Sequence, residues 1–84
     1  MTTKEFDALE LFTQKIEELN DSIITTTKTP IINQRNDEIV AFDVRCSIEG
    51  YYEESVTIIY ENLVENTSEE LERLDDLYNR VNEN

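Results

Sequence analysis

The chain contains no histidine, and it has few of the other residues on which enzymes depend. Without imidazole there is no His general base, no Ser–His or Cys–His nucleophile and no His metal ligand. A single glycine excludes a glycine-rich phosphate loop, and a single cysteine excludes a thiolate zinc site. We therefore expect a protein that is not an enzyme and that holds neither a metal nor a cofactor.

The one cysteine, Cys46, also bears on the cellular compartment. It falls on the apolar side of an alternating segment, where a small core residue is expected, and it has no partner for an internal disulfide. The N-terminus lacks the basic stretch and apolar run of a signal peptide, and no segment is long and apolar enough to cross a bilayer. These features predict a cytoplasmic protein that does not bind membranes.

Basic residues are scarce as well. Seven Lys and Arg stand against 20 Asp and Glu, which gives a net charge of −13 over 84 residues. Such like charge destabilises a compact domain, and nucleic acid or an anionic membrane would repel it. A basic protein partner is therefore expected, with no direct nucleic-acid binding. The alternative is that the acids only maintain solubility, although the charge exceeds the magnitude of roughly 2–8 that solubility requires in a small domain.

Two amphipathic helices are expected at the ends of the chain. A capping box of Thr2 and Glu5 would begin the first, which runs from residue 3 to about residue 20. Its apolar stripe recurs at three- and four-residue steps: Phe6, Leu9, Phe12, Ile16 and Leu19. Thr67 and Glu70 form a second capping box. The stripe of the last helix is Leu71, Leu74, Tyr78 and Val81.

The middle of the chain changes to an alternating pattern. Residues 22–32 are rich in β-branched side chains and predict a strand, which Pro30 places at a sheet edge or a strand end. The buried side of a second strand is Val40, Phe42, Val44, Cys46 and Ile48. A third strand continues with Tyr52, Val56, Ile58 and Tyr60. Turns are expected at residues 34–37 and at Gly50.

These elements define the fold class as α+β in one domain, residues 1–84. The order is α-β-β-β-α, with a three-stranded antiparallel sheet and two helices on one of its faces. So thin a core favours a homodimer. Leu11 lies on the far side of the first helix, either as a scattered surface residue or as a contact with a second subunit.

The acids concentrate in the second half of the chain, where residues 49–84 contain eleven acids and two bases. Glu53 and Glu61 are expected on the outer side of the third strand, and Glu54, Glu65 and Glu70 in loops beside it. Opposite the apolar stripe of the last helix lie Glu69, Glu72, Asp76 and Glu83. Carboxylates at such spacings approach the charge density of a nucleic-acid backbone. The expected partner-binding residues are Tyr51, Glu53, Glu54, Glu61, Glu65, Glu69, Glu70, Glu72, Asp75 and Asp76.

Small size, strong negative charge, a single domain and the lack of catalytic groups together resemble the small acidic DNA mimics and anti-defence inhibitors of phages and mobile elements. The resemblance covers the whole chain and involves no shared motif. It implies a non-enzymatic inhibitor that occupies the DNA-binding surface of a basic protein in the host cytoplasm. One alternative is an acidic immunity protein or antitoxin that neutralises a basic nuclease toxin. Another is an assembly protein whose sheet face mediates oligomers.

Overall fold

The computed structural model describes residues 2–84, which form a three-stranded antiparallel sheet and three helices. The elements are α1 (Thr3–Glu18), β1 (Ile24–Asn33), β2 (Glu38–Ile48), β3 (Tyr52–Ile59), α2 (Tyr60–Glu65) and α3 (Thr67–Asn82). The expected α+β class and α-β-β-β-α order are confirmed. The short helix α2 is an addition, because six residues are too few for their periodicity to be recognised in a sequence.

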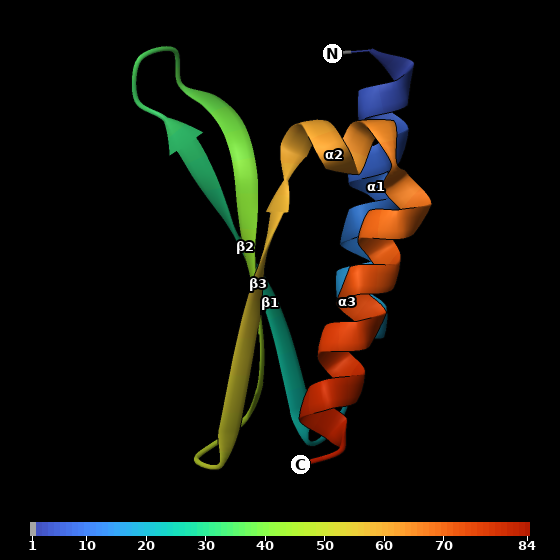
Figure 1. The fold of residues 1–84 in the computed structure, drawn as a ribbon, viewed down its shortest axis with the longest axis vertical. Helices are drawn as coiled ribbons and strands as arrows, with labels where there is room; N and C mark the ends of the chain where they lie inside the picture. Colours follow the sequence, from blue (N-terminus) through green and yellow to red (C-terminus); the bar gives the residue numbers. More distant parts are fainter. Residues whose placement is uncertain (1) are drawn as a thin grey trace.

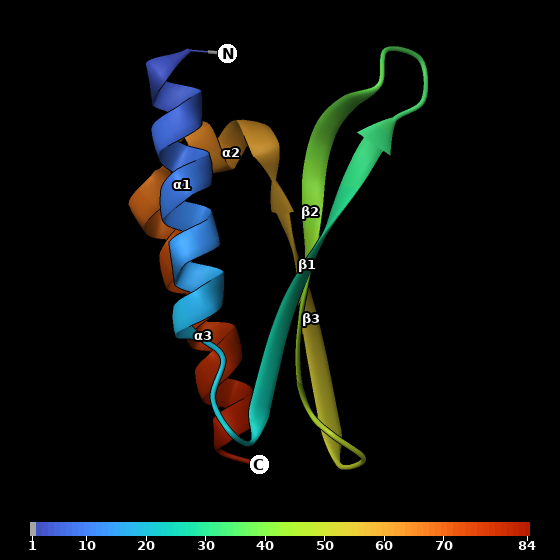
Figure 2. The ribbon, with the colours of Figure 1, turned by 180° about the vertical axis from the view of Figure 1, so that it is seen from behind.

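The molecule has two layers, with all the helices on one face of the sheet (Figure 1). α1 and α3 run side by side along the strands, and α2 lies across one end of the pair (Figure 2). The sheet has the order β1-β2-β3, so β1 is an edge strand, which is one of the two positions that Pro30 predicted. One sheet face is therefore covered by helices, and the other face is open.

α1 begins with the predicted capping box. The Thr2 hydroxyl accepts a hydrogen bond from the Glu5 backbone N–H at 3.2 Å, and the Glu5 carboxylate accepts one from the Thr2 backbone N–H at 3.3 Å. Phe6 does not join the core as expected and is 59% exposed, because it lies about 120° around the helix from Phe12 at 3.6 residues per turn. Ala8 is the first buried residue of α1 instead, and the buried stripe continues through Phe12 and Ile16.

The break after α1 is fixed by two polar side chains. The Asn20 amide donates to the Ile16 carbonyl at 2.8 Å and to the Thr26 carbonyl at 3.0 Å, and its oxygen accepts from the Thr26 N–H at 2.9 Å. Asp21 accepts from the backbone N–H groups of the two residues that lead into β1, at 2.8 and 2.7 Å. The chain therefore leaves the helix and enters the edge strand in one defined direction.

β2 departs from strict alternation at its start. Ile31 of β1 is opposite Ala41 of β2, but Ile32 is opposite Ile39, so Val40 is an extra residue in the ladder. Val40 was expected in the core and is 43% exposed, whereas Ala41 is buried. The rest of the expected alternation holds. Both predicted turns are also present, with Gly50 at a φ of 72° in the second.

The core lies between the covered sheet face and the helices. Phe12 of α1 packs against Phe42 of β2 with a ring-centroid distance of 4.8 Å, and Cys46 is fully buried beside them. α3 contributes Leu74 and Val81 as expected, and also Leu77, which the predicted stripe omitted. None of the buried side-chain nitrogen and oxygen atoms of residues 2–84 lacks a hydrogen-bond partner.

The start of α3 differs from the prediction. Asn66 is the N-cap residue, with φ −133° and ψ 54°, and its side chain makes no capping hydrogen bond. Thr67 instead donates to the Leu63 carbonyl of α2 at 2.7 Å, and Glu70 pairs with Arg73. The predicted capping box of Thr67 and Glu70 is therefore wrong. The Thr67 hydroxyl bonds to a carbonyl of α2 in place of capping α3, and no sequence motif predicts this contact.

Candidate protein-binding surface

The charge is divided unequally between the two layers. α1, α2 and α3 together contain twelve acids and four bases, a net −8, whereas the three strands contain four acids and two bases, a net −2. The helices put their apolar stripes on the sheet, so their acids occupy the opposite, solvent-facing sides. The negative charge of this protein is therefore mainly a property of the helical layer.

The open face of the sheet has a different character. Val44 and Cys46 of β2 are buried toward the helices, so the residues that alternate with them face outward. Three cross-strand rows follow from the register: Thr29–Asp43–Thr57, Thr27–Arg45–Ser55 and Thr25–Ser47–Glu53. Arg45 lies 3.4 Å from Asp43 and 3.9 Å from Glu53. Hydroxyl groups and partly compensated charges cover this face, and it is not the anionic one.

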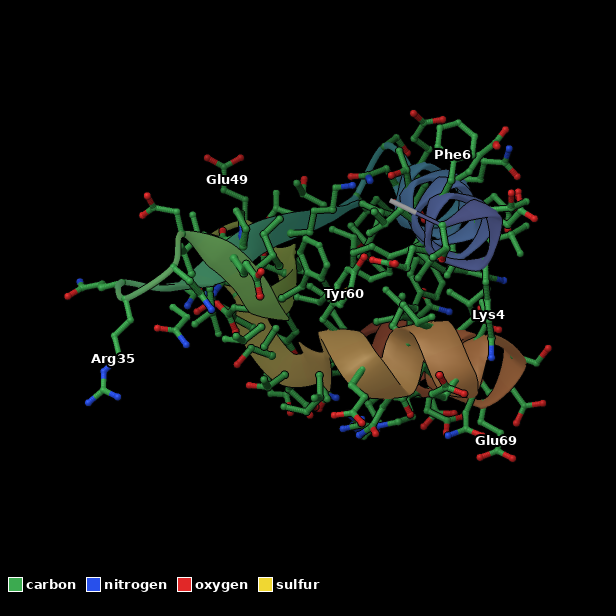
Figure 3. The ribbon with its side chains drawn as sticks, turned by 90° about the horizontal axis from the view of Figure 1, so that it is seen from above. Lys4, Phe6, Arg35, Glu49, Tyr60 and Glu69 are labelled. Carbon is green, nitrogen blue, oxygen red and sulfur yellow. The ribbon has the colours of Figure 1, made fainter. Side chains whose placement is uncertain are left out.

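Several acids of the helical layer are compensated by bases. Lys15 of α1 contacts Asp75 of α3 at 3.2 Å. Lys4, which Figure 3 shows directed from α1 toward the neighbouring helices, contacts Glu65 at the end of α2 at 3.0 Å. Both ion pairs join α1 to the neighbouring helical segment. Glu70 is buried and lies 3.0 Å from Arg73. Asp75 and Glu65 thus support the packing of the helices, and all three acids are less available to a partner than uncompensated carboxylates.

Glu54 has a structural role of the same kind. It was expected in a loop, but it lies within β3 on the face that the helices cover. Its carboxylate accepts from the Tyr52 hydroxyl at 2.6 Å and from Arg80 of α3 at 3.0 Å. The Tyr52 hydroxyl, and then Arg80, lower the pKa of the Glu54 carboxyl. Glu54 therefore joins the sheet to α3 and stays ionised there.

Glu18 also pairs with Lys15, at 3.4 Å, and the half-buried Glu5 accepts a hydrogen bond from the Tyr60 hydroxyl at 2.8 Å. The remaining acids on the helices are exposed and have no ion-pair partner among residues 2–84. They are Asp7, Glu10 and Glu17 of α1, Glu61 of α2, and Glu69, Glu72 and Asp76 of α3. We call these seven residues the anionic helical surface. Figure 3 shows Glu69 directed away from both α1 and the sheet. The steps between Glu69, Glu72 and Asp76 are three and four residues, so these carboxylates follow one side of α3.

The expected partner-binding residues do not form one cluster. Four of them belong to the anionic helical surface: Glu61, Glu69, Glu72 and Asp76. Glu65, Glu70 and Asp75 lie in the same layer and are paired with bases. Tyr51 and Glu53 lie at the β2–β3 turn and on the open sheet face, and Tyr51 is exposed. Glu61 was expected on the third strand and lies on α2, because the chain turns into a helix at Tyr60.

The acids of α1 were not among the expected residues. Asp7, Glu10 and Glu17 are separated by steps of three and seven residues, which place them on one side of a helix. The prediction from the sequence was confined to residues 49–84, because most of the acids lie in that half. Only the packing of α1 beside α3 shows that the N-terminal acids extend the same layer.

The charge density of this layer can be compared with that of DNA. α1 and α3 have 16 residues each, which corresponds to a length of about 24 Å at 1.5 Å per residue. The net −6 of these two helices over that length is one charge per about 4 Å, comparable to the ~3.4 Å per phosphate along one DNA strand. The helical layer therefore has a net linear charge similar to that of a single nucleic-acid strand.

Three further observations define the protein. No three potential metal-ligating side chains of residues 2–84 are grouped so that they could hold an ion, and none of the described helices combines the length and apolarity of a membrane span. Comparison with protein-family models, curated proteins and solved structures found no match. The fold and surface thus define a small α+β protein with an anionic helical layer and a hydroxyl-rich open sheet.

Proposed function

We propose that this protein is a non-enzymatic inhibitor that binds a basic DNA-binding protein through the anionic helical surface and competes with DNA for it. The observation that supports the proposal is the net charge along α1 and α3, one per about 4 Å, which is comparable to the spacing of phosphates along a DNA strand. A groove that binds DNA through Lys and Arg offers the complementary charge. The helical scaffold supplies an ordered array in place of a flexible acidic tail.

The uncompensated carboxylates supply the attraction. Glu69, Glu72 and Asp76 are exposed and make no ion pair among residues 2–84, so a cationic partner need not displace an existing base. Long-range attraction by such a surface accelerates association, and salt weakens it. The ion pairs Lys15–Asp75 and Lys4–Glu65 hold the helices together while this surface is engaged.

The test uses two variants with the same net charge. Glu69→Gln/Glu72→Gln/Asp76→Asn removes three acids from the anionic helical surface, and Asp37→Asn/Glu38→Gln/Glu49→Gln removes three from the hairpin turns. Each changes the net charge from −13 to −10. The immobilised wild-type chain is used to capture proteins from a bacterial lysate, and the captured protein is identified and purified. Its affinity for the three chains is then compared at several salt concentrations and in competition with duplex DNA.

We expect the helical variant to bind at least about tenfold more weakly at low salt, with the hairpin variant close to wild type. Duplex DNA should displace the captured protein, and raising the salt should weaken the complex. Equal binding by all three chains, or a complex that DNA leaves intact, would contradict the proposal. A captured nuclease toxin whose activity the chain blocks would instead identify the protein as an immunity protein or antitoxin.

A further inference from the structure

The β1–β2 hairpin extends beyond the helical layer and carries an unusual number of exposed apolar residues. Figures 1 and 2 show its end leaning away from α1 and α2. Ile31, Ile32, Ile39 and Val40 are between 38% and 49% exposed. We call residues 30–41 the hairpin arm. Contiguous exposed apolar residues on a small domain mark an interaction surface, because their burial removes them from water.

The open face of the arm continues into the neighbouring strand. Ala41 is opposite Ile31 on one side and Ile59 of β3 on the other, so these three side chains form a row across the sheet. The adjacent Phe42 is buried under the helices, which places the row on the open face. Ala41 is 4% exposed, although no helix covers it. Its two larger neighbours shield it, and they remain in contact with solvent.

The helix-facing side of the arm exposes isoleucines as well. Ile32 and Ile39 are cross-strand partners beyond the register shift. Ile39 also lines a surface hollow with Leu9 of α1 and Tyr60 of α2, and three acids line the same hollow: Glu5, Asp37 and Glu38. The arm therefore exposes apolar side chains on both faces, and neither face is covered. An isolated two-stranded ribbon is marginally stable in water, so further packing would favour this part of the fold.

The distribution of charge along the chain indicates which kind of partner can cover the hairpin arm. Residues 22–36 contain no acid and include Lys28 and Arg35, whereas the rest of the chain has 20 acids and five bases. Two copies of a protein with net charge −13 repel each other across most of their surface. They can approach most closely where the acids are missing, and this stretch contains β1 and the first half of the arm. An identical chain is thus excluded from the helical layer but not from the arm.

The end of the arm is also complementary to itself. Arg35 points away from the rest of the molecule and makes no ion pair among residues 2–84 (Figure 3). Asp37 and Glu38 follow two and three positions later. Two arms that lie side by side with their tips together, related by a twofold axis parallel to their length, would place Arg35 of one copy beside Glu38 of the other. A cationic foreign protein, in contrast, would meet Arg35 and little negative charge on the β1 side of the arm.

We propose that the hairpin arm is a homodimer interface and that a second copy of this chain covers it. The contact is isologous, with the isoleucines of the two arms side by side and the Arg35–Glu38 pairs at the tips. This proposal does not rest on the proposed function, since the arm and the anionic helical surface are separate parts of the molecule. A dimer of this kind would leave both anionic helical surfaces open.

The first experiment compares two doubly substituted chains by sedimentation velocity over a range of concentrations. Ile32→Thr/Val40→Thr removes apolar surface from the arm but keeps β-branched residues, which suit strands. Ile23→Thr/Leu11→Gln removes comparable surface elsewhere and tests Leu11 as the dimer contact. We expect wild type and the second chain to dimerise alike, and the arm variant to associate at least about tenfold more weakly. Circular dichroism establishes that each chain is folded.

The second experiment tests the ion pair. Arg35→Glu should weaken the dimer, and Arg35→Glu/Glu38→Arg should restore it, because the exchanged charges again face each other across the twofold axis. Three results would overturn the proposal: a wild-type chain that stays monomeric at every concentration in high salt, an arm variant that dimerises as well as wild type, or a charge exchange that restores nothing.

Discussion

The hydroxyl of Tyr78 on α3 donates a hydrogen bond to the carboxylate of Asp21, and the two residues are 57 positions apart in the sequence. The other oxygen of Asp21 accepts from the backbone N–H groups of Ile23 and Ile24. A single carboxylate therefore shapes the entry into β1 and connects that entry to the C-terminal helix. This contact supports the closure of the two-layer fold near its C-terminal end.

Removing the Tyr78 hydroxyl should loosen that closure. We expect Tyr78→Phe to lower the midpoint of thermal unfolding, because the phenol loses its carboxylate partner and its ring remains in place. Tyr51→Phe is the matched control, since Tyr51 is exposed at the β2–β3 turn. Combining Tyr78→Phe with Asp21→Asn should cost less than the sum of the single changes. Equal midpoints for Tyr78→Phe and Tyr51→Phe would show that the hydrogen bond contributes nothing.

Three hydrogen bonds, each from a tyrosine hydroxyl to a carboxylate, allow us to predict how stability changes at acidic pH. They are Tyr60–Glu5, Tyr78–Asp21 and Tyr52–Glu54. The Tyr60 hydroxyl lowers the pKa of Glu5 and the Tyr52 hydroxyl that of Glu54, both below 4.5. The Ile24 N–H, and then Tyr78, lower the pKa of Asp21 below 3.8. Each lowered carboxyl pKa stabilises the folded protein at pH values above the pKa of the unfolded state. This stabilisation is lost as the pH falls through the pKa of the folded state.

The same three hydrogen bonds also affect stability at alkaline pH, through the tyrosine hydroxyls. Hydrogen bonds to their carboxylates raise the pKa of Tyr52 and Tyr78 above 10.0, and burial followed by the Glu5 hydrogen bond raises that of Tyr60. A raised tyrosine pKa contributes stability below 10.0 that is lost as pH rises through the folded value. Urea unfolding across pH in high salt, where general repulsion is screened, should show a loss at both ends. Stability that keeps rising below pH 3.8 would contradict this reading.

The net charge itself should be measurable as a cost to folding. We expect salt to raise the thermal midpoint, because screening weakens repulsion among the exposed carboxylates. Glu69→Gln/Glu72→Gln/Asp76→Asn should be more stable than wild type at low salt and should respond less to added salt. Differential scanning calorimetry at several NaCl concentrations measures both effects. A midpoint that falls with salt would mean that attractive ion pairs, such as Lys15–Asp75, outweigh the repulsion.

The sequence predicted the fold wherever the pattern of side chains is local. The Thr2–Glu5 capping box and the alternation from Phe42 to Ile48 are properties of neighbouring residues, and both are present in the structure. The predictions were wrong where the conformation of a residue depends on a segment elsewhere in the chain. Val40 is displaced by a register shift that depends on β1, and Thr67 bonds to α2 in place of starting a capping box.

The same distinction applies to the candidate surface. The exposure of Glu69, Glu72 and Asp76 followed from their position opposite the apolar stripe of the helix. The compensation of Glu54 by Arg80 depends on how α3 crosses β3, which periodicity does not encode. Sequence patterns therefore predicted which carboxylates are exposed on a helix, and the tertiary structure determined which of them are paired.

Leu77 provides a direct test of the core, because the predicted stripe of α3 omitted it. Leu77 is fully buried among the helices and the sheet, whereas Leu11 is 47% exposed on the outer side of α1. Leu77→Ala should lower the free energy of unfolding by about 2–5 kcal/mol, since it removes buried methyl groups and leaves a cavity. Leu11→Ala should change it by less than about 0.5 kcal/mol, as is usual for surface substitutions.

Urea unfolding followed by circular dichroism measures both leucine variants. A small domain has only about 5–15 kcal/mol of stability, so the loss at Leu77 should shift the urea midpoint strongly. Equal costs at the two leucines would mean that α3 does not pack on the sheet as the structure shows. A large cost at Leu11 in concentrated solution alone would mean that the outer side of α1, and not the hairpin arm, contacts a second subunit.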